Sequence, residues 1–177
     1  MADSSIVFSH PEGAPKTATA SASGVKRVMK TRVFVVNPAN GEMVSPEEWL
    51  KSENPTSAEW LVVENVDYGF KFKIHKNNLG VYDWNAAVEA AKSAGEGCRL
   101  PNRFEMITLY NAIYTENLNN VIEAIGGEVL FGWCWTGEED DDPQCSSTHA
   151  WLADLALGVV NYGTKTTTYQ VRVVSGF

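Results

Sequence analysis

A run of five consecutive acidic residues, Glu138 to Asp142, is the densest group of metal-ligating side chains in the sequence. Carboxylate oxygens are the hard ligands that Ca²⁺ prefers, so Glu139, Asp140 and Asp141 are candidate calcium ligands. The run lacks the alternating acidic residues and the glycine of an EF-hand loop. Blocks of like charge are more often solvated loops that hold no metal. We therefore expect no cofactor, with calcium at this loop as the alternative.

Tryptophans stand on both sides of the acidic run, and a polar turn follows them. Aromatic faces stack on sugar rings and apolar surfaces, and tryptophan is enriched in binding hot spots. These features predict a ligand-binding surface made of Trp133, Trp135, His149, Asn161, Tyr162 and Lys165. The alternative is that the tryptophans are core residues and the turn is an ordinary exposed loop.

Side chains for catalysis are scattered along the sequence. It contains no Gly-x-Ser-x-Gly, no His-Glu-x-x-His and no phosphate-binding loop, and its histidines are His10, His75 and His149. The cysteines Cys98, Cys134 and Cys145 form an odd set without the Cys-x-x-Cys spacing of a zinc site. We expect them to be reduced, with a Cys134–Cys145 bridge across the acidic loop as the alternative. The expectation is a protein without enzymatic activity.

The stretch from Cys98 to Glu105 predicts a loop that ends in a helix start. Pro101 disfavours helical geometry at the residue before it. Asn102 is a good N-cap, and Glu105 stands three residues on, where its carboxylate can complete a capping box. Arg99 lies close to this junction, so we expect its guanidinium to tie loops together through several hydrogen bonds. The alternative is a surface arginine beside a capped helix.

Charge and hydropathy exclude several classes of partner. The formal net charge of −8 repels a phosphate backbone, so nucleic-acid binding is disfavoured. No apolar run approaches the roughly 20 residues that a membrane-spanning helix needs. The first ten residues lack the basic and apolar regions of a secretory signal, which favours folding in a cytosol.

The order of the predicted elements is strands, then helices, then strands again, which indicates an α+β protein with a mostly antiparallel sheet. Residues 1–24 have a composition typical of a flexible arm, and their apolar head, Ile6-Val7-Phe8, is suited to docking in an assembly. Residues 25–58 predict a strand, a turn and a short helix. Residues 59–177 are expected to form the main domain.

Several stretches of the main domain have strand patterns. Glu59–Val66 and Phe70–His75 predict a hairpin, with apolar and polar residues alternating along its second strand. A further strand is expected from Val129 to Trp135. A single strand from Thr168 to Val174, in which alternate residues should face opposite sides, is expected to close the sheet. Ser45 and Asp83 predict helix starts, as Asn102 does.

The main domain resembles a family of bacterial and phage domains, the Lcl C-terminal type. The similarity consists of Arg99-Leu100-Pro101-Asn102-Arg103-x-Glu105, Trp133-Cys134-Trp135-Thr136-Gly137-Glu138, Ala150-Trp151-x-x-Asp154-Leu155 and Tyr169-Gln170-Val171-Arg172-Val173-Val174. This resemblance implies a C-type-lectin-like fold, similar in outline to the sulfatase-modifying enzymes. It implies core positions for Trp135 and Trp151, and we expect Arg172 to point inward or into a loop junction. Val173 stands where the family has proline.

A recognition domain of this type joined to an arm favours a virion-associated structural protein. We expect a capsid decoration, head fibre or tail component that is oligomeric, contacts other virion proteins and binds a glycan or protein of the host surface. A bacterial surface adhesin is the alternative, and a sulfatase-modifying enzyme that uses Cys134 is a further one.

Overall fold

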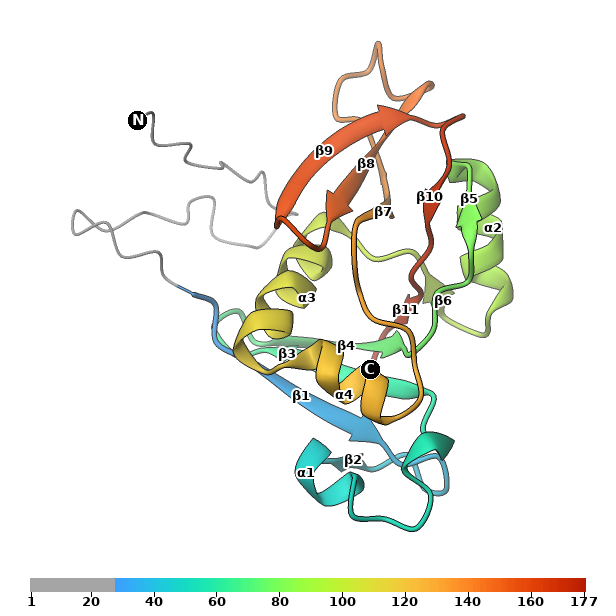
Figure 1. The fold of residues 1–177 in the computed structure, drawn as a ribbon. Coiled ribbons are helices and arrows are strands. Elements are labelled where there is room, and N and C mark those ends of the chain that lie inside the picture. The colour runs from blue at the N-terminus through green and yellow to red at the C-terminus, as the bar shows by residue number, and fades with distance from the viewer. Residues whose placement is uncertain (1–27) are drawn as a thin grey trace, which may run out of the picture.

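A computed structural model describes residues 28–177 of the chain. It is an α+β structure whose strands form two sheets, with helices packed against them (Figure 1). The apolar head of the arm, Ile6-Val7-Phe8, lies outside the described residues, so its predicted docking role stays a prediction. In the described part, no helix is both long enough and apolar enough to cross a bilayer.

The first sheet has six strands, and all its pairings are antiparallel. In spatial order they are β2 (Met43–Val44), β1 (Thr31–Val36), β3 (Trp60–Asn65), β4 (Phe70–His75), β11 (Val174–Ser175) and β6 (Cys98–Arg99). The hairpin of β3 and β4 confirms the alternation seen in the sequence. Because β1 pairs with β3 over five residue pairs, the described part of the predicted extension, residues 28–58, shares the sheet of the main domain.

The second sheet has five strands and holds most of the candidate ligand residues. In spatial order they are β5 (Val81–Tyr82), β10 (Tyr169–Gln170), β7 (Trp133–Glu139), β8 (His149–Asp154) and β9 (Val159–Thr164). Only the pairing of β10 with β7 is parallel. The strand predicted to begin at Val129 begins at Trp133 instead and runs on through Glu139, so the acidic run starts inside β7.

The three helices α1, α2 and α3 begin at residues whose side chains cap them. They are α1 (Pro46–Trp49), a 3-10 turn η1 (Pro55–Ser57), α2 (Trp84–Ser93), α3 (Arg103–Thr115) and α4 (Leu118–Ala124). Ser45 and Asp83 cap α1 and α2 through their side chains. Asn102 and Glu105 form the predicted capping box at the start of α3, with both reciprocal hydrogen bonds present.

The expected closing strand, Thr168 to Val174, is divided between the two sheets. Its first part, β10, pairs with β5 and β7, whereas its last residue, Val174, belongs to β11 and pairs with β4 and β6. Between them the chain crosses from one sheet to the other. The N–H of His75, the last residue of β4, donates to the Val173 carbonyl, and the N–H of Leu79 in the following loop donates to the Val171 carbonyl. The alternating exposure predicted there is absent, because the crossing segment is buried on all sides.

Two clusters of buried side chains hold the sheets and helices together. The larger cluster joins the first sheet to α3 and α4, and includes Val35, Phe72, Leu109 and Ile122. The smaller one lies between α2 and the second sheet, and includes Ala87, Trp135 and Leu152. Burial of this apolar surface is the main favourable contribution to folding.

Candidate functional site

The acidic run folds back onto the start of α3, where Arg103 binds it. The guanidinium of Arg103 donates to both carboxylate oxygens of Asp141, at 2.9 and 3.2 Å, and its Nε lies 3.3 Å from a Glu138 oxygen. Burial works to lower the pKa of Arg103, but these carboxylates outweigh it and leave the pKa raised. Arg103 therefore stays charged and fixes the loop to the helix.

A second cation, Lys165, holds the same loop from the other side. Its Nζ donates to Glu139 at 2.8 Å and to the backbone carbonyl of Ser146 at 2.6 Å, and it lies 4.3 Å from the centroid of the Trp84 ring. Lys165 is only 8% exposed. The structure thus removes it from the predicted ligand surface and makes it a structural residue.

The predicted calcium ligands are engaged with protein groups. Glu139 pairs with Lys165, Asp141 pairs with Arg103, and Asp140 accepts a hydrogen bond from the backbone N–H of Asp142. Within residues 28–177, no group of three or more histidine, cysteine or acidic side chains is arranged to hold a metal ion. The run acts here as a loop anchored by ion pairs.

Three aromatic side chains on β8 and β9 lie in contact beside this anchored loop. We call His149, Tyr162 and Trp151 the aromatic row. Tyr162 meets the Trp151 ring at 5.8 Å and the His149 ring at 5.9 Å between centroids, both edge to face. The Tyr162 side chain is 53% exposed, whereas the other two are partly buried. The register explains this contact, since Trp151 lies opposite Tyr162 across the two strands.

The remaining predicted ligand residues divide between surface and core. Asn161 is exposed next to Tyr162, and Trp133 is partly buried. Trp135 is fully buried, donates its Nε1–H to the Tyr82 carbonyl at 3.0 Å and packs edge to face on Tyr169. Burial excludes Trp135 from contact with a ligand, so the alternative, a core tryptophan, holds for it. Trp151 is not fully buried, contrary to the core position that the resemblance implies.

Arg99 performs the structural role expected of it. It forms two hydrogen bonds with the Glu105 carboxylate, at 2.7 and 2.6 Å, and a third with the Leu100 carbonyl. The same carboxylate accepts the Asn102 backbone N–H at 2.8 Å. Hydrogen bonding to Glu105 is the main cause of a raised pKa for Arg99. The loop and the helix start are thereby joined through one buried carboxylate.

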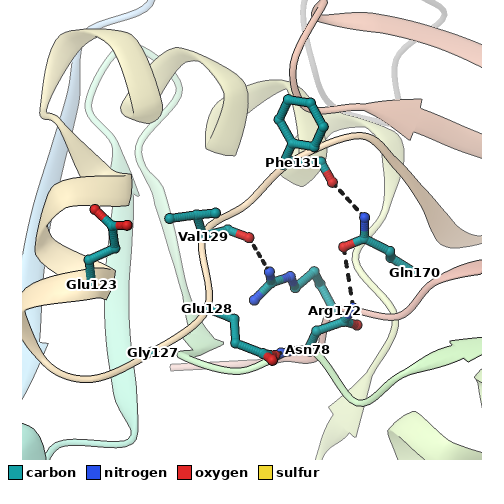
Figure 2. Close-up of a pocket in the computed structure, with 8 residues that line it drawn as sticks. All are labelled: Asn78, Glu123, Gly127, Glu128, Val129, Phe131, Gln170 and Arg172. Carbon is teal, nitrogen blue, oxygen red and sulfur yellow. Dashed lines mark hydrogen bonds between the residues drawn. The ribbon is translucent and has the colours of Figure 1, made fainter.

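An open pocket of about 450 Å³ lies on another part of the surface (Figure 2). Its lining residues are Asn78, Glu123, Gly127, Glu128, Val129, Phe131, Gln170 and Arg172. Gln170 donates to the Phe131 carbonyl at 2.9 Å and accepts from Asn78 at 3.2 Å. No motif or periodicity in the sequence brings these residues together, which is why sequence reasoning missed the pocket.

Arg172 forms the floor of this pocket, and its predicted inward orientation is confirmed. It is 1% exposed and donates to the backbone carbonyls of Lys76 and Val129. Its Nε–H has no hydrogen-bond partner within residues 28–177, and no carboxylate there lies within ion-pair distance. Burial lowers its pKa. Arg172 joins the turn after β4 to the segment before β7.

All three cysteines carry free thiols, so the alternative of a Cys134–Cys145 bridge is not realised. Cys98 and Cys134 are buried, whereas Cys145 is partly exposed in the acidic loop. Burial raises the pKa of Cys134 to about 12. This thiol is therefore protonated at neutral pH and is a poor nucleophile.

Comparison with known proteins leaves this surface and pocket to be interpreted from their own geometry. The chain matches no family model, and no curated protein sequence is significantly similar to it.

Proposed function

We propose that this protein is a non-enzymatic recognition module that is carried on a virion and contacts a glycan or protein of a host surface. The observation that carries the recognition part is the aromatic row, with a half-exposed Tyr162 held between two other rings. Tyrosine and tryptophan supply large contact area and a polar group at low entropic cost.

The aromatic row suits binding because its side chains are positioned before a ligand arrives. The Arg103 guanidinium lies 4.3 Å from the Trp151 ring centroid and is itself fixed by two carboxylates. The imidazole of His149 shares a 2.8 Å hydrogen bond with the Thr148 hydroxyl. Side chains that are already ordered lose less entropy on binding, so more of the contact energy appears as affinity.

The alternative of a sulfatase-modifying enzyme requires a reactive thiolate. Cys134, the candidate nucleophile, is fully buried and its pKa is raised to about 12. A reactive cysteine instead has a lowered pKa and partial exposure. The chemistry of this residue therefore disfavours that alternative.

The C-type-lectin-like fold is part of the proposal, and two features support it. The last strand, β11, returns to the sheet that contains β1, β3 and β4. The strand β6 belongs to the same sheet, and after Leu100 and Pro101 it is followed by the predicted helix start at Asn102. The divided closing strand is a departure from the single strand expected.

The virion setting is supported by the combination of two separate parts in one chain. The sequence of the arm contains one apolar run, Ile6-Val7-Phe8, that is suited to docking. The folded part carries the aromatic row on its surface. A bacterial surface adhesin would use the same row, so incorporation into particles distinguishes the two settings.

Substitution in the aromatic row tests the recognition part. Tyr162→Ala should weaken binding to a glycan array or to host cells by about tenfold or more, as loss of a hot-spot aromatic does. Phe177→Ala is the matched control, because Phe177 is an aromatic residue that is 55% exposed and follows β11 in the other sheet. Equal binding by the Tyr162→Ala variant and the unchanged protein would reject the row as the binding surface.

Deletion of residues 2–24 tests the virion part. The shortened chain should remain folded, judged by its circular dichroism and melting temperature, but should no longer join the particle. Normal incorporation of the shortened chain would reject the arm as the anchor. The two experiments have separate readouts, because the first measures binding to the host ligand and the second measures incorporation into the particle.

A further inference from the structure

The terminal strands of the two sheets differ greatly in length. Three of them, β2, β6 and β5, have two residues each, whereas β9 has six. Short terminal strands are one way in which proteins prevent pairing with other chains. In the part of the chain that the structure describes, β9 is the terminal strand that lacks this protection.

The sequence of β9 contains none of the residues that usually block an edge. Val159–Thr164 has no charged residue and no proline, and three of its residues, Asn161, Tyr162 and Thr164, are exposed. By contrast, the part of β1 that β2 leaves unpaired carries the exposed, charged Arg32. The outer side of β9 therefore remains competent to accept another strand.

The pairing of β9 with β8 shows which backbone groups face outward. The N–H of Lys165, the residue after β9, donates to the Thr148 carbonyl at 2.8 Å. Because backbone groups alternate along an antiparallel pair, Val159, Asn161 and Gly163 face β8, and Val160, Tyr162 and Thr164 face outward. The Tyr162 N–H is bonded to the neighbouring Asn161 side chain at 2.9 Å, an exposed bond that a strand carbonyl can replace.

The sequence outside the described residues offers one segment that fits this edge. Ser4–Ser9 reads Ser-Ser-Ile-Val-Phe-Ser, and it holds the only run of three consecutive apolar residues among residues 1–27. β-branched and aromatic residues favour strands. A strand placed beside β9 would bring alternate members of this run next to Val160 and Tyr162.

The described chain starts close to β9, which makes this occupant reachable. Thr31 shares a 2.7 Å hydroxyl hydrogen bond with Thr115 at the end of α3. The adjacent Tyr114 donates to the carbonyl of Ala156, in the turn between β8 and β9, at 3.0 Å. Residues 10–27 number 18, which span up to roughly 60 Å when extended, so they reach β9 of the same chain or of a neighbouring copy.

We propose that Ser4–Ser9 binds along the outer side of β9 as an additional strand of the second sheet. Backbone hydrogen bonds would supply affinity, as in other cases of strand addition, and the Ile6-Val7-Phe8 side chains would cover the exposed edge. This inference deepens the assembly part of the proposed function and does not depend on the recognition part.

Amide hydrogen exchange in the full chain tests the pairing. Exchange at Val160, Tyr162 and Thr164 should be about tenfold slower in the unchanged protein than in a Val7→Pro variant, since proline interrupts strand pairing. The inward amides of Val159, Asn161 and Gly163 are internal controls and should not change. Ala18→Pro is the matched control in the arm, and it should leave all six rates unchanged. Equal rates at the outward amides in both proteins would overturn the proposal.

Photo-crosslinking identifies the occupant. A Phe8→p-benzoylphenylalanine chain should give adducts mainly with the peptide that contains residues 159–164. Adducts between two copies support both the edge as the acceptor and the arm as an anchor. Adducts within one chain support the edge as the acceptor but reject the anchoring role of the arm, and the mass of the adducts tells which occurs. Adducts elsewhere, or spread evenly over the surface, would overturn it. Loss of binding in Tyr162→Ala has no bearing on this result, so the two proposals fail independently.

Discussion

The Arg103 guanidinium lies 4.3 Å from the centroid of the Trp151 ring and at the same time donates two hydrogen bonds to Asp141. One side chain thus connects the acidic loop, the start of α3 and the aromatic row. Its planar shape allows stacking and paired hydrogen bonds together, which a lysine ammonium does not. The orientation of the proposed recognition surface therefore depends on a residue that is itself largely covered.

Replacement of Arg103 should disturb both the loop and the aromatic row. Arg103→Ala should lower the free energy of unfolding by about 1–2 kcal/mol, through lost packing and lost charged hydrogen bonds. Arg103→Lys should recover only part of this loss, because it keeps the charge without the paired geometry. Urea denaturation followed by tryptophan fluorescence measures both variants.

Asp141→Asn is the control for the Arg103 variants. The Asp141 side chain is 58% exposed, so solvent screens its ion pair with Arg103. The free energy of unfolding should therefore fall by less than about 0.5 kcal/mol. If Asp141→Asn proved as costly as Arg103→Ala, the ion pair rather than the stacking would hold the loop.

Replacement of Arg172 should have a larger effect, because its hydrogen bonds are buried. Arg172→Ala should lower the free energy of unfolding by about 2–4 kcal/mol, since it leaves a cavity and two carbonyls without their donor. Arg172→Met should lower the free energy of unfolding by less than Arg172→Ala does. Methionine fills the space, and the substitution removes a buried charge that lacks a carboxylate partner in residues 28–177. Thermal and urea unfolding give the two values, and an unchanged melting temperature in Arg172→Ala would refute the bracing role.

Local signals in the sequence predicted the helix starts and the first hairpin correctly. The capping box of Asn102 and Glu105 depends on two residues three positions apart, so its geometry is contained in the sequence itself. The hairpin of β3 and β4 likewise follows from alternation on either side of a short turn. The inward position of Arg172 was expected, although its acceptors, Lys76 and Val129, were not.

Contacts between distant segments could not be predicted in the same way. Lys165 belongs to the predicted polar turn and was expected to face a ligand, but its partners Glu139 and Ser146 lie in another part of the chain. The acidic run resembled a cation site because the two residues that pair with it, Arg103 and Lys165, lie in other parts of the chain. The divided closing strand has the same cause, since a strand pattern does not state which sheet it joins.

Calcium should not stabilise the folded protein. Glu139 and Asp141 are already paired with cationic side chains, so an added ion would have to displace them. We expect equal melting temperatures in CaCl₂ and in EDTA, with MgCl₂ as a control for ionic strength. A melting temperature that is higher in CaCl₂ but not in MgCl₂ would show that calcium binds the folded state. That result would support the calcium site that the sequence suggested.

The thiols should differ in their reactivity toward an alkylating agent in the native protein. Cys145 is partly exposed, whereas Cys98 and Cys134 are buried. Labelling at Cys145 should be on the order of 100-fold faster than at Cys134, because burial blocks access to Cys134 and raises the pKa of its thiol. Mass spectrometry of the labelled peptides measures the three rates. Fast labelling at Cys134 would reopen the role of this residue as a nucleophile.

Cys134 should also make the folded protein less stable at high pH. The pKa of its thiol rises from 9.0 to about 12 on folding, so between these values the unfolded chain has lost the proton and the folded chain has kept it. The unfolded state then binds fewer protons, and the free energy of unfolding falls as pH rises, by up to about 1.4 kcal/mol per pH unit. Below pH 9 both states are protonated and this dependence is absent. Cys134→Ala should therefore give a shallower decline above pH 9, whereas Cys145→Ala should follow the unchanged protein. Parallel curves for Cys134→Ala and the unchanged protein would show that this thiol ionises equally in both states.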